Sequence, residues 1–347
     1  MILSMTSLTP LKNCMIRHKT EVDRYYQTVL LTLGLKDLMD KGTLGCRFVS
    51  AEPLFKQASS GKEVYPDIVL QYDNDNRGIL LEVKTSLSEV DFFLLEDLRQ
   101  LELYSNKLMG WETNSKEVID HSLVLLCHSM DSDKVQEKLN QWIAEGKLNI
   151  TKNFSIVEWS IVESLKYGPK DVFLIRLRMG QTGCDLLDAK LHQNIKFEVD
   201  TIYTKYEKCR FVRKEPPVEY TMNQLWSCIF PALHEQTENF TCTIDEILEV
   251  AYAYYIPWSG LLGEYSQVRK TWIRKAMNAF CKIELAEELG DNPDGYKVFY
   301  GKQIQKDVSD YFVDRICRNI FEEARRKPIK DTLGEAQRVL SEFGQPE

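Results

Sequence analysis

The chain has 347 residues, of which 44% are hydrophobic and 28% are charged, and its formal net charge at pH 7 is −8. This length suits two domains, and the composition is that of an ordinary folded protein. No apolar run approaches the roughly 20 residues that cross a bilayer, so contact with a membrane is not expected. A negative net charge is not typical of a protein that coats nucleic acid, although local contact with phosphates remains compatible with it.

The first half of the chain alternates helices and strands. Thr20 can cap a helix over residues 20–38, in which apolar residues recur at helical spacing. The elements expected after it are strands at 46–55, 67–72 and 78–84, a helix at 87–108, a strand at 122–127, a helix at 132–145, and strands at 154–162 and 171–178. This order predicts an α/β domain of residues 1–180, with a mixed sheet flanked by helices.

The second half is predicted to be mainly helical. A connector is expected at 181–217, followed by a second domain at 218–347. Its expected elements are helices at 222–234, 244–255 and 265–288, a turn at 291–295, a strand at 296–300 and a last helix at 307–326. Three helices followed by a β-hairpin is the order of a winged helix-turn-helix, so this domain is expected to be winged-helix-like.

The nine cysteines are widely spaced and odd in number. They form neither a CxxC pair nor a Cys/His ligand cluster along the sequence. The pattern therefore predicts neither a disulfide framework nor a structural zinc site. Most of these side chains are expected to be buried thiols in a reducing cytoplasm, which is the predicted location.

Asp67, Glu82 and Lys84, which lie between positions 65 and 86, predict a metal-binding active site. Side chains alternate faces along a strand, so Glu82 and Lys84 point the same way, and a hairpin can bring Asp67 beside them. Two carboxylates, a backbone carbonyl and waters suit a hard octahedral cation such as Mg²⁺. Such a cation lowers the pKa of a bound water, and Lys84 can orient that water or stabilise an anionic transition state.

Each of these residues also has an ordinary structural interpretation. Asp67 can cap the turn that opens a strand, and Glu82 and Lys84 can form a solvated strand face. The apolar residues around them, 79–81 and Val83, indicate instead a strand that is buried on both sides. Charged side chains are rare in such strands unless they have a function, so the functional interpretation is preferred.

The Pro-Asp pair that ends at Asp67, followed by Glu82-Val83-Lys84, resembles the PD-(D/E)XK nuclease superfamily. The resemblance covers about residues 15–180 and implies a restriction-endonuclease-like fold. It implies Asp67, Glu82 and the backbone carbonyl of Val83 as metal ligands and Lys84 as a catalytic residue. It also implies Mg²⁺ as the cofactor, with Mn²⁺ as a substitute.

Two further features of that family have candidates in this sequence. A helix before the first strand often supplies another acidic metal ligand, for which Glu21 is the first candidate and Asp23 the second. The RecB-type branch carries a Q-x-x-x-Y motif on the helix after the lysine, and Gln100 and Tyr104 match it. Their i,i+4 spacing places both on one helix face, where they can brace the site or touch the DNA backbone. For Glu21, Gln100 and Tyr104, an ordinary helix position is the alternative.

Some RecB-type relatives hold an iron–sulfur cluster through cysteines that flank the nuclease core, with several grouped after it. Cys14 and Cys184 are isolated in this sequence, so no iron–sulfur cluster is expected.

Residues 265–282 carry five basic residues and no acidic residue. Lys270 and Arg274 lie one helical turn apart on a solvent-facing stripe, as in a recognition helix, and Arg269 and Lys275 adjoin them as candidate nucleic-acid contacts. The alternative is a basic helix that packs on the acidic remainder of the protein or pairs with a partner.

These features predict a metal-dependent nuclease that acts on DNA, with RNA not excluded. By analogy of architecture alone, such an enzyme fits mobile-element or anti-phage defence. The alternative is a catalytically inactive nuclease-fold protein that binds nucleic acid or assembles a complex. A homodimer or a partner protein is compatible with either. The Q-x-x-x-Y motif favours ends or single strands, whereas the basic helix favours duplex.

Overall fold

The computed structural model describes residues 8–40, 42, 45–51, 53–72, 76–85, 87, 91–113, 116–118, 120–163, 171–177, 195–198, 214–234, 239–251, 266–290, 292–301 and 308–326. The chain divides into two compact units. The sheet unit comprises residues 24–216 and 252–265, and the helical unit comprises residues 1–23, 217–251 and 266–347. The sequence had placed residues 1–180 in one domain, whereas residues 1–23 group with the helical unit.

Helix α1 (Leu8–Asp40) contributes to both units, because the division falls between Asp23 and Arg24. It has 33 residues and begins well before the predicted start at residue 20. Pro10 lies in its first turn, where a missing N–H costs no helical hydrogen bond. No described helix is long and apolar enough to cross a membrane.

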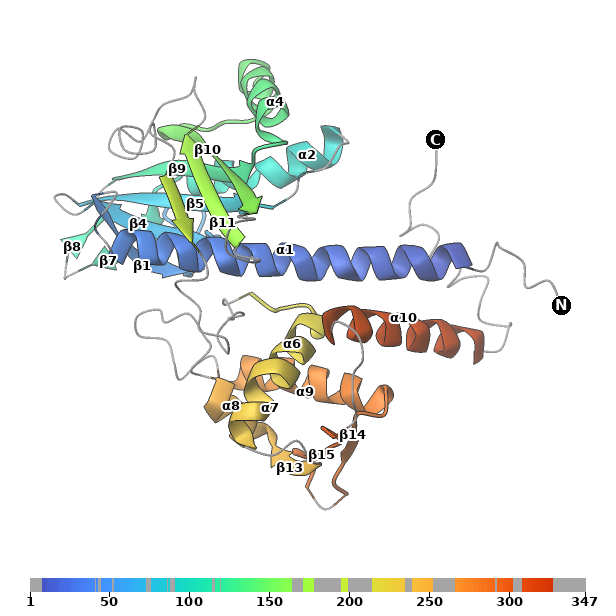
Figure 1. Cartoon of the computed structure of the whole chain (residues 1–347). Helices are drawn as coiled ribbons and strands as arrows, with labels where there is room; N and C mark the ends of the chain where they lie inside the picture. Colours follow the sequence, from blue (N-terminus) through green and yellow to red (C-terminus); the bar gives the residue numbers. More distant parts are fainter. Residues whose placement is uncertain are drawn as a thin grey trace. The chain divides into compact units, whose positions relative to one another are not determined.

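A mixed sheet forms the centre of the sheet unit, which confirms the predicted α/β class (Figure 1). Its seven described strands lie in the order β1-β4-β5-β9-β10-β11-β12. Their bounds are β1 (Cys46–Ala51), β4 (Ile68–Tyr72), β5 (Arg77–Lys84), β9 (Asp120–His128), β10 (Phe154–Glu163), β11 (Asp171–Leu177) and β12 (Ile195–Glu198). The pairs β5–β9 and β9–β10 are parallel and the others are antiparallel. Strand β12 falls inside the predicted connector 181–217, because its four residues are too few to show a strand pattern.

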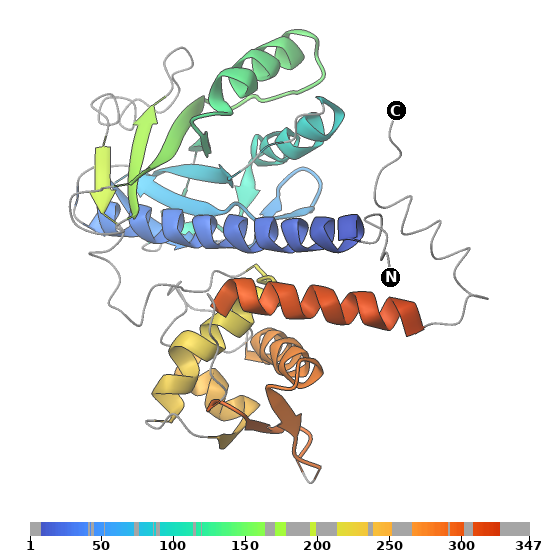
Figure 2. The same cartoon turned by 45° about the vertical axis from the view of Figure 1, so that its right-hand side comes forward.

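Helices flank both faces of this sheet. In Figures 1 and 2, α2 (Asp91–Leu98) and α4 (Ser132–Ala144) lie on one side and the second half of α1 lies on the other. The core between the sheet and the first of these layers contains Leu98, Leu125 and Ile156. These central strands are buried on both faces, as their continuous apolar runs predict.

The helix predicted at 87–108 is in fact shorter and interrupted. Helix α2 ends at Leu98, and the five-residue helix α3 (Gln100–Tyr104) follows. At Ser105 the chain turns, and β6 (Leu108–Met109) joins a small sheet with β2 (Phe55–Gln57) and β3 (Glu63–Val64). A further short hairpin pairs β7 (Glu112–Thr113) with β8 (Lys116–Glu117). The predicted strand 46–55 is likewise divided between β1 and β2.

The helical unit contains a helical part and a three-stranded sheet. The helices are α6 (Val218–Gln224), the π-helical turn η3 (Leu225–Ile229), α7 (Phe230–Leu233), α8 (Ile244–Ala251), α9 (Ser266–Lys282) and α10 (Val308–Arg326). The strands β13 (Phe240–Thr243), β14 (Ala286–Glu288) and β15 (Gly295–Val298) lie in the order β13-β15-β14. Aromatic residues such as Trp226, Phe280 and Phe312 pack together in its core.

The prediction of a helix to residue 288 was wrong, because α9 ends at Lys282. The N–H of Leu285 bonds to the carbonyl of Phe280 and that of Glu284 to Cys281, which is the Schellman pattern of a helix end. Glu284 occupies the left-handed position, with φ 61°, that glycine usually fills. The sequence therefore carries no glycine to mark this end.

Candidate active site

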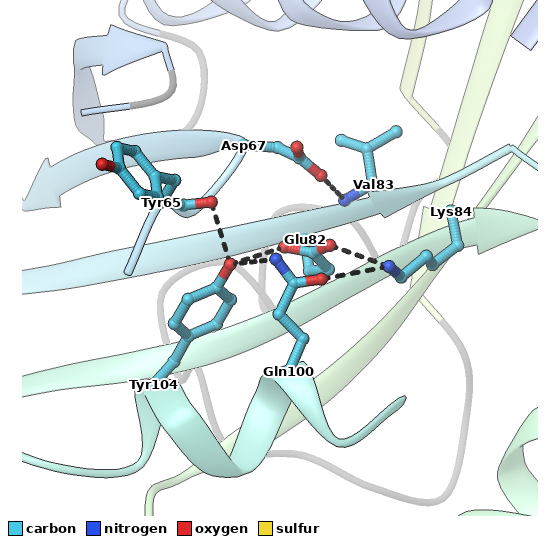
Figure 3. Close-up of polar contacts among 7 residues, drawn as sticks. All are labelled: Tyr65, Asp67, Glu82, Val83, Lys84, Gln100 and Tyr104. Carbon is cyan, nitrogen blue, oxygen red and sulfur yellow. Dashed lines mark hydrogen bonds and ion pairs between the residues drawn. The ribbon is translucent and has the colours of Figure 1, made fainter. Parts of the chain in front are cut away.

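The β4–β5 hairpin brings together the charged residues that the sequence singles out. Ile68 pairs with Leu81 across the hairpin, so Asp67 stands just before β4, opposite the end of β5. There Oδ2 of Asp67 accepts a hydrogen bond from the backbone N–H of Val83 at 2.6 Å. The hydrogen bond fixes the Asp67 carboxylate beside the Glu82-Val83-Lys84 segment, 16 residues later in the chain (Figure 3).

Glu82 lies at the centre of this group and is 3% exposed. One of its oxygens contacts Nζ of Lys84 at 2.9 Å, and the other accepts a hydrogen bond from the hydroxyl of Tyr104 at 3.0 Å. Burial, together with the negative charge of Asp67, raises the pKa of Glu82 to about 7, although Lys84 acts in the opposite direction. The two carboxylates thus repel each other in a region with little solvent.

Gln100 and Tyr104 connect α3 to the charged strand. Nζ of Lys84 donates to Oε1 of Gln100 at 3.3 Å, and Nε2 of Gln100 donates to the hydroxyl of Tyr104 at 2.7 Å. The hydroxyl of Tyr104 lies 3.0 Å from Glu82 and also 3.0 Å from the carbonyl of Tyr65, both of which are acceptors (Figure 3). The i,i+4 pair therefore contacts both Lys84 and Glu82, an arrangement compatible with the predicted bracing role.

The charge states of the two remaining titratable groups follow from their surroundings. Burial lowers the pKa of Lys84, but the carboxylates of Glu82 and Asp67 outweigh burial, and the net shift is upward. Burial and the same two carboxylates also raise the pKa of Tyr104. Lys84 is therefore an ammonium and Tyr104 a neutral phenol across the ordinary pH range.

Hard oxygen donors dominate this site. Asp67 and Glu82 supply carboxylate oxygens, and a bound divalent cation would offset the burial and the repulsion that raise the pKa of Glu82. The donor set therefore fits Mg²⁺ or Mn²⁺ better than a soft metal. The backbone carbonyl of Val83, the third predicted ligand, belongs to the segment whose N–H already binds Asp67.

Glu21 and Asp23, the predicted acidic ligands from the preceding helix, belong to the helical unit. Both side chains are exposed, and Glu21 lines a pocket there together with His18 and Glu219. Their role as metal ligands stays a prediction, because they belong to a different unit from Asp67 and Glu82. The helical pattern of residues 20–38 is continuous, so no local feature indicates that α1 is shared between two units.

The four predicted nucleic-acid contacts on α9 lie in different environments. Arg269 is only 2% exposed, so its assignment as a phosphate contact was wrong. Lys270 forms an ion pair with Asp245 at 2.5 Å, and Arg274 forms one with Asp294 at 2.7 Å. Lys275 is exposed. Two of the four cations are thus partly neutralised within their own unit, as the alternative interpretation of a basic helix expects.

Three further residues near the site are not indicated by any sequence motif. Asp97 on α2 contributes to the raised pKa of Lys84. Its position three residues before Gln100 is the one sequence feature that could have placed it near the site. His121 Nε2 contacts the carbonyl of Tyr104 at 2.7 Å and anchors the end of α3. Tyr65, which is 44% exposed, accepts a hydrogen bond from Tyr104 through its backbone carbonyl. Its place directly before the Pro-Asp pair is the sequence feature that could have placed it near the site.

Comparison of the chain with protein-family models, with curated proteins and with solved structures finds no significant match.

Proposed function

We propose that the sheet unit is a metal-dependent nuclease that hydrolyses phosphodiester bonds, most simply in DNA. The observation that carries the proposal is the juxtaposition of Asp67, Glu82 and Lys84 at one end of a β-hairpin. A buried carboxylate beside a second carboxylate and a half-buried ammonium is costly to assemble, because these charges lose part of their hydration. Such an arrangement is expected where it serves catalysis.

The arrangement of elements around the three residues supports a PD-(D/E)XK-type assignment. The charged hairpin is followed by helices α2 and α3 and then by β9, which lies parallel to β5. The RecB-type pair, Gln100 and Tyr104, contacts Lys84 and Glu82, as a supporting role in that family requires.

The chain's own residues divide the proposed chemistry among them. Asp67 and Glu82, with the carbonyl of Val83, would hold the divalent cation. When bound, that cation supplies an activated water and neutralises charge on the phosphate. Lys84 provides the positive charge that stabilises the anionic transition state, and Gln100 holds its ammonium in place. Tyr104 donates to Glu82 and so orients the carboxylate.

The helical unit is proposed to position the substrate as a winged-helix-like domain. Its order of elements, a helical segment, β13, α8, α9, β14 and β15, with β15 between the other two strands, agrees with such a topology. Of the candidates on α9, Lys275 is exposed, and Lys270 and Arg274 would have to leave or share their ion pairs with Asp245 and Asp294 to bind phosphate. A role in mobile-element or anti-phage defence remains an extension of this proposal.

A cleavage panel tests the proposed function. The full chain is incubated with linear, circular, single-stranded and branched DNA and with RNA, in the presence of Mg²⁺, Mn²⁺ or a chelator. Lys84→Ala is expected to reduce metal-dependent cleavage by about 10²–10³-fold, the usual cost of removing a group that stabilises an anionic transition state. Lys62→Ala, an exposed lysine in the turn between β2 and β3, is the matched control and should cleave normally.

Two outcomes would count against the assignment. Equal cleavage by Lys84→Ala and the control would remove Lys84 from the mechanism. Absence of cleavage on every substrate with both metals, while the wild-type chain still binds nucleic acid, would favour the inactive binding or assembly protein instead. Faster cleavage of RNA than of DNA would leave the proposed phosphodiester hydrolysis unchanged and would replace DNA with RNA as the substrate.

A further inference from the structure

A second cluster of chemically reactive side chains lies within the helical unit. Cys14 and His18 stand one turn apart on α1, and Cys317 lies on α10. The Sγ atoms of the two cysteines are 3.1 Å apart. One ligand atom from each of the three residues lies within 4.8 Å of the other two. Cys14, which is isolated in the sequence, therefore lies beside Cys317 in the structure, whereas Cys184 lies outside the described residues.

The imidazole of His18 is held by a buried carboxylate. Nδ1 of His18 contacts Oε1 of Glu219, a residue of α6 that is 3% exposed. A hydrogen bond donated by Nδ1 fixes the neutral tautomer and leaves Nε2 as the nitrogen with a free lone pair. Histidine ligands in metal sites commonly donate their other N–H to a carboxylate in this way.

We infer that Cys14, His18 and Cys317 bind one Zn²⁺ ion, with Glu219 orienting His18. Thiolate sulfur and imidazole nitrogen are the donors that zinc favours, in contrast to the carboxylates of the sheet unit. A tetrahedral ion with Zn–S bonds of about 2.3 Å separates two sulfurs by roughly 3.8 Å. The two sulfurs, now 3.1 Å apart, therefore need to separate by roughly 0.7 Å. Binding releases one proton from each thiol, while the neutral imidazole donates its Nε2 lone pair.

A disulfide between Cys14 and Cys317 would explain only two of the four side chains gathered here. It needs the sulfurs to approach to about 2.05 Å and loses two electrons and two protons to an oxidant. It also gives no role to His18 or to the carboxylate that holds it. A metal ion uses all four side chains.

A pocket lies beside two of these side chains, His18 and Glu219. Its volume is about 520 Å³, and His18 and Glu219 both form part of its wall, together with Lys275, Asn278 and Ile316. Zinc sites with three protein ligands keep the fourth position for water or another small ligand. The inferred site thus has three protein donors, of which His18 borders the pocket, and water can take the fourth position.

The test is zinc binding by the full-length, reduced and metal-stripped chain. We expect one equivalent of Zn²⁺ per chain, and Co²⁺ in its place should give the thiolate charge-transfer absorption of a tetrahedral site. Cys14→Ser and Cys317→Ser should abolish this binding, and Glu219→Gln should weaken it by about 10–100-fold, as for other residues that hold a ligating histidine.

Cys281→Ser, which alters a half-buried thiol of α9 in the same unit, is the matched control. Asp67→Ala should bind zinc normally, so this result is independent of the proposed nuclease activity.

A second measurement needs no variant and does not depend on variant folding. In the wild-type chain, Zn²⁺ should protect Cys14 and Cys317 from alkylation, as located by mass spectrometry, and should leave Cys281 as reactive as before. Failure of the reduced wild-type chain to bind Zn²⁺, or equal protection of all three thiols, would overturn the inference. Loss of two hydrogens at Cys14 and Cys317 without reductant, combined with no zinc binding after reduction, would assign a disulfide instead.

Discussion

The two units gather polar side chains of opposite chemical character. The sheet unit places two carboxylates, an ammonium and a phenol on one hairpin and one short helix, within a stretch of 38 residues from Asp67 to Tyr104. The helical unit places two thiols and an imidazole together from opposite ends of the chain. Hard oxygen donors select Mg²⁺ or Mn²⁺, and sulfur with imidazole selects zinc. Substitutions in one cluster should therefore leave the metal preference of the other unchanged.

The largest expected effect comes from Asp67→Ala. It removes one of two carboxylates that would hold the catalytic cation, a contribution of several kcal/mol to transition-state stabilisation. At about 1.4 kcal/mol per tenfold, single-turnover cleavage should fall by about 10³-fold or more. Calorimetry should find weaker Mg²⁺ binding together with unchanged Zn²⁺ binding. Loss of both metals at once would mean that the two sites are not separate.

The pKa of Glu82 predicts an unusual dependence of stability on pH. It is about 7 in the folded chain, against an ordinary value of 4.5, so between these pH values the folded state binds more protons than the unfolded state. The free energy of unfolding therefore falls as the pH rises through this window, by up to about 3 kcal/mol.

Glu82→Gln should remove most of that fall. Urea unfolding at about pH 5 and about pH 8, without divalent cation, measures the effect as a difference between the two conditions. Glu137→Gln, at an exposed position on α4, is the control and should keep the wild-type dependence. The same pH dependence in Glu82→Gln as in wild type would contradict the assignment. Mg²⁺ should restore stability to wild type at the higher pH.

A smaller effect is expected for Tyr104→Phe, which keeps the buried ring and removes the hydroxyl that donates to Glu82. Cleavage should fall by about 10–100-fold, the usual range for a group that orients a metal ligand. Tyr65→Phe is its matched control, because Tyr65 contacts the site through its backbone carbonyl and its hydroxyl bonds to Glu63 instead. Equal rates for the two variants would show that the Tyr104 hydroxyl has no part in the mechanism.

The smallest effect is expected for Lys270→Gln. If α9 contacts duplex DNA, the slope of log affinity against log salt should decrease by about one or less, since Lys270 already pairs with Asp245. Asp245→Asn should change affinity in the opposite direction by releasing that lysine. Identical salt dependence in wild type and both variants would remove Lys270 from the interface and favour a structural role for the basic helix.

The candidate active site could be predicted because its residues are close in sequence. The alternation of side chains along β5 relates Glu82 to Lys84, and a four-residue helical step relates Gln100 to Tyr104. Asp67 joins Glu82 and Lys84 through a single contact across the β4–β5 hairpin. The α/β class of the sheet unit was predictable for the same reason, because the apolar runs that mark each helix or strand are local in the sequence.

The remaining features depend on contacts that no local pattern encodes. Cys14 and Cys317 are 303 residues apart, so their proximity depends on the packing of α1 against α10. The exact end of α9 depends on Glu284 in a conformation that glycine usually adopts. Arg269 belongs to a run of basic residues that looks solvated, yet packing buries it. In each case tertiary structure decided what the sequence pattern left open.

The most direct test of the central claim compares wild type with Glu82→Gln on circular single-stranded and duplex DNA, with Mg²⁺, with Mn²⁺ and with a chelator. Both chains are first shown to have the same far-ultraviolet circular dichroism and a cooperative unfolding transition. We predict cleavage by the wild-type chain only when a divalent cation is present, and a rate lower by about 10³-fold for Glu82→Gln. Equal cleavage by the two chains, or cleavage by wild type that persists in the chelator, would contradict the account.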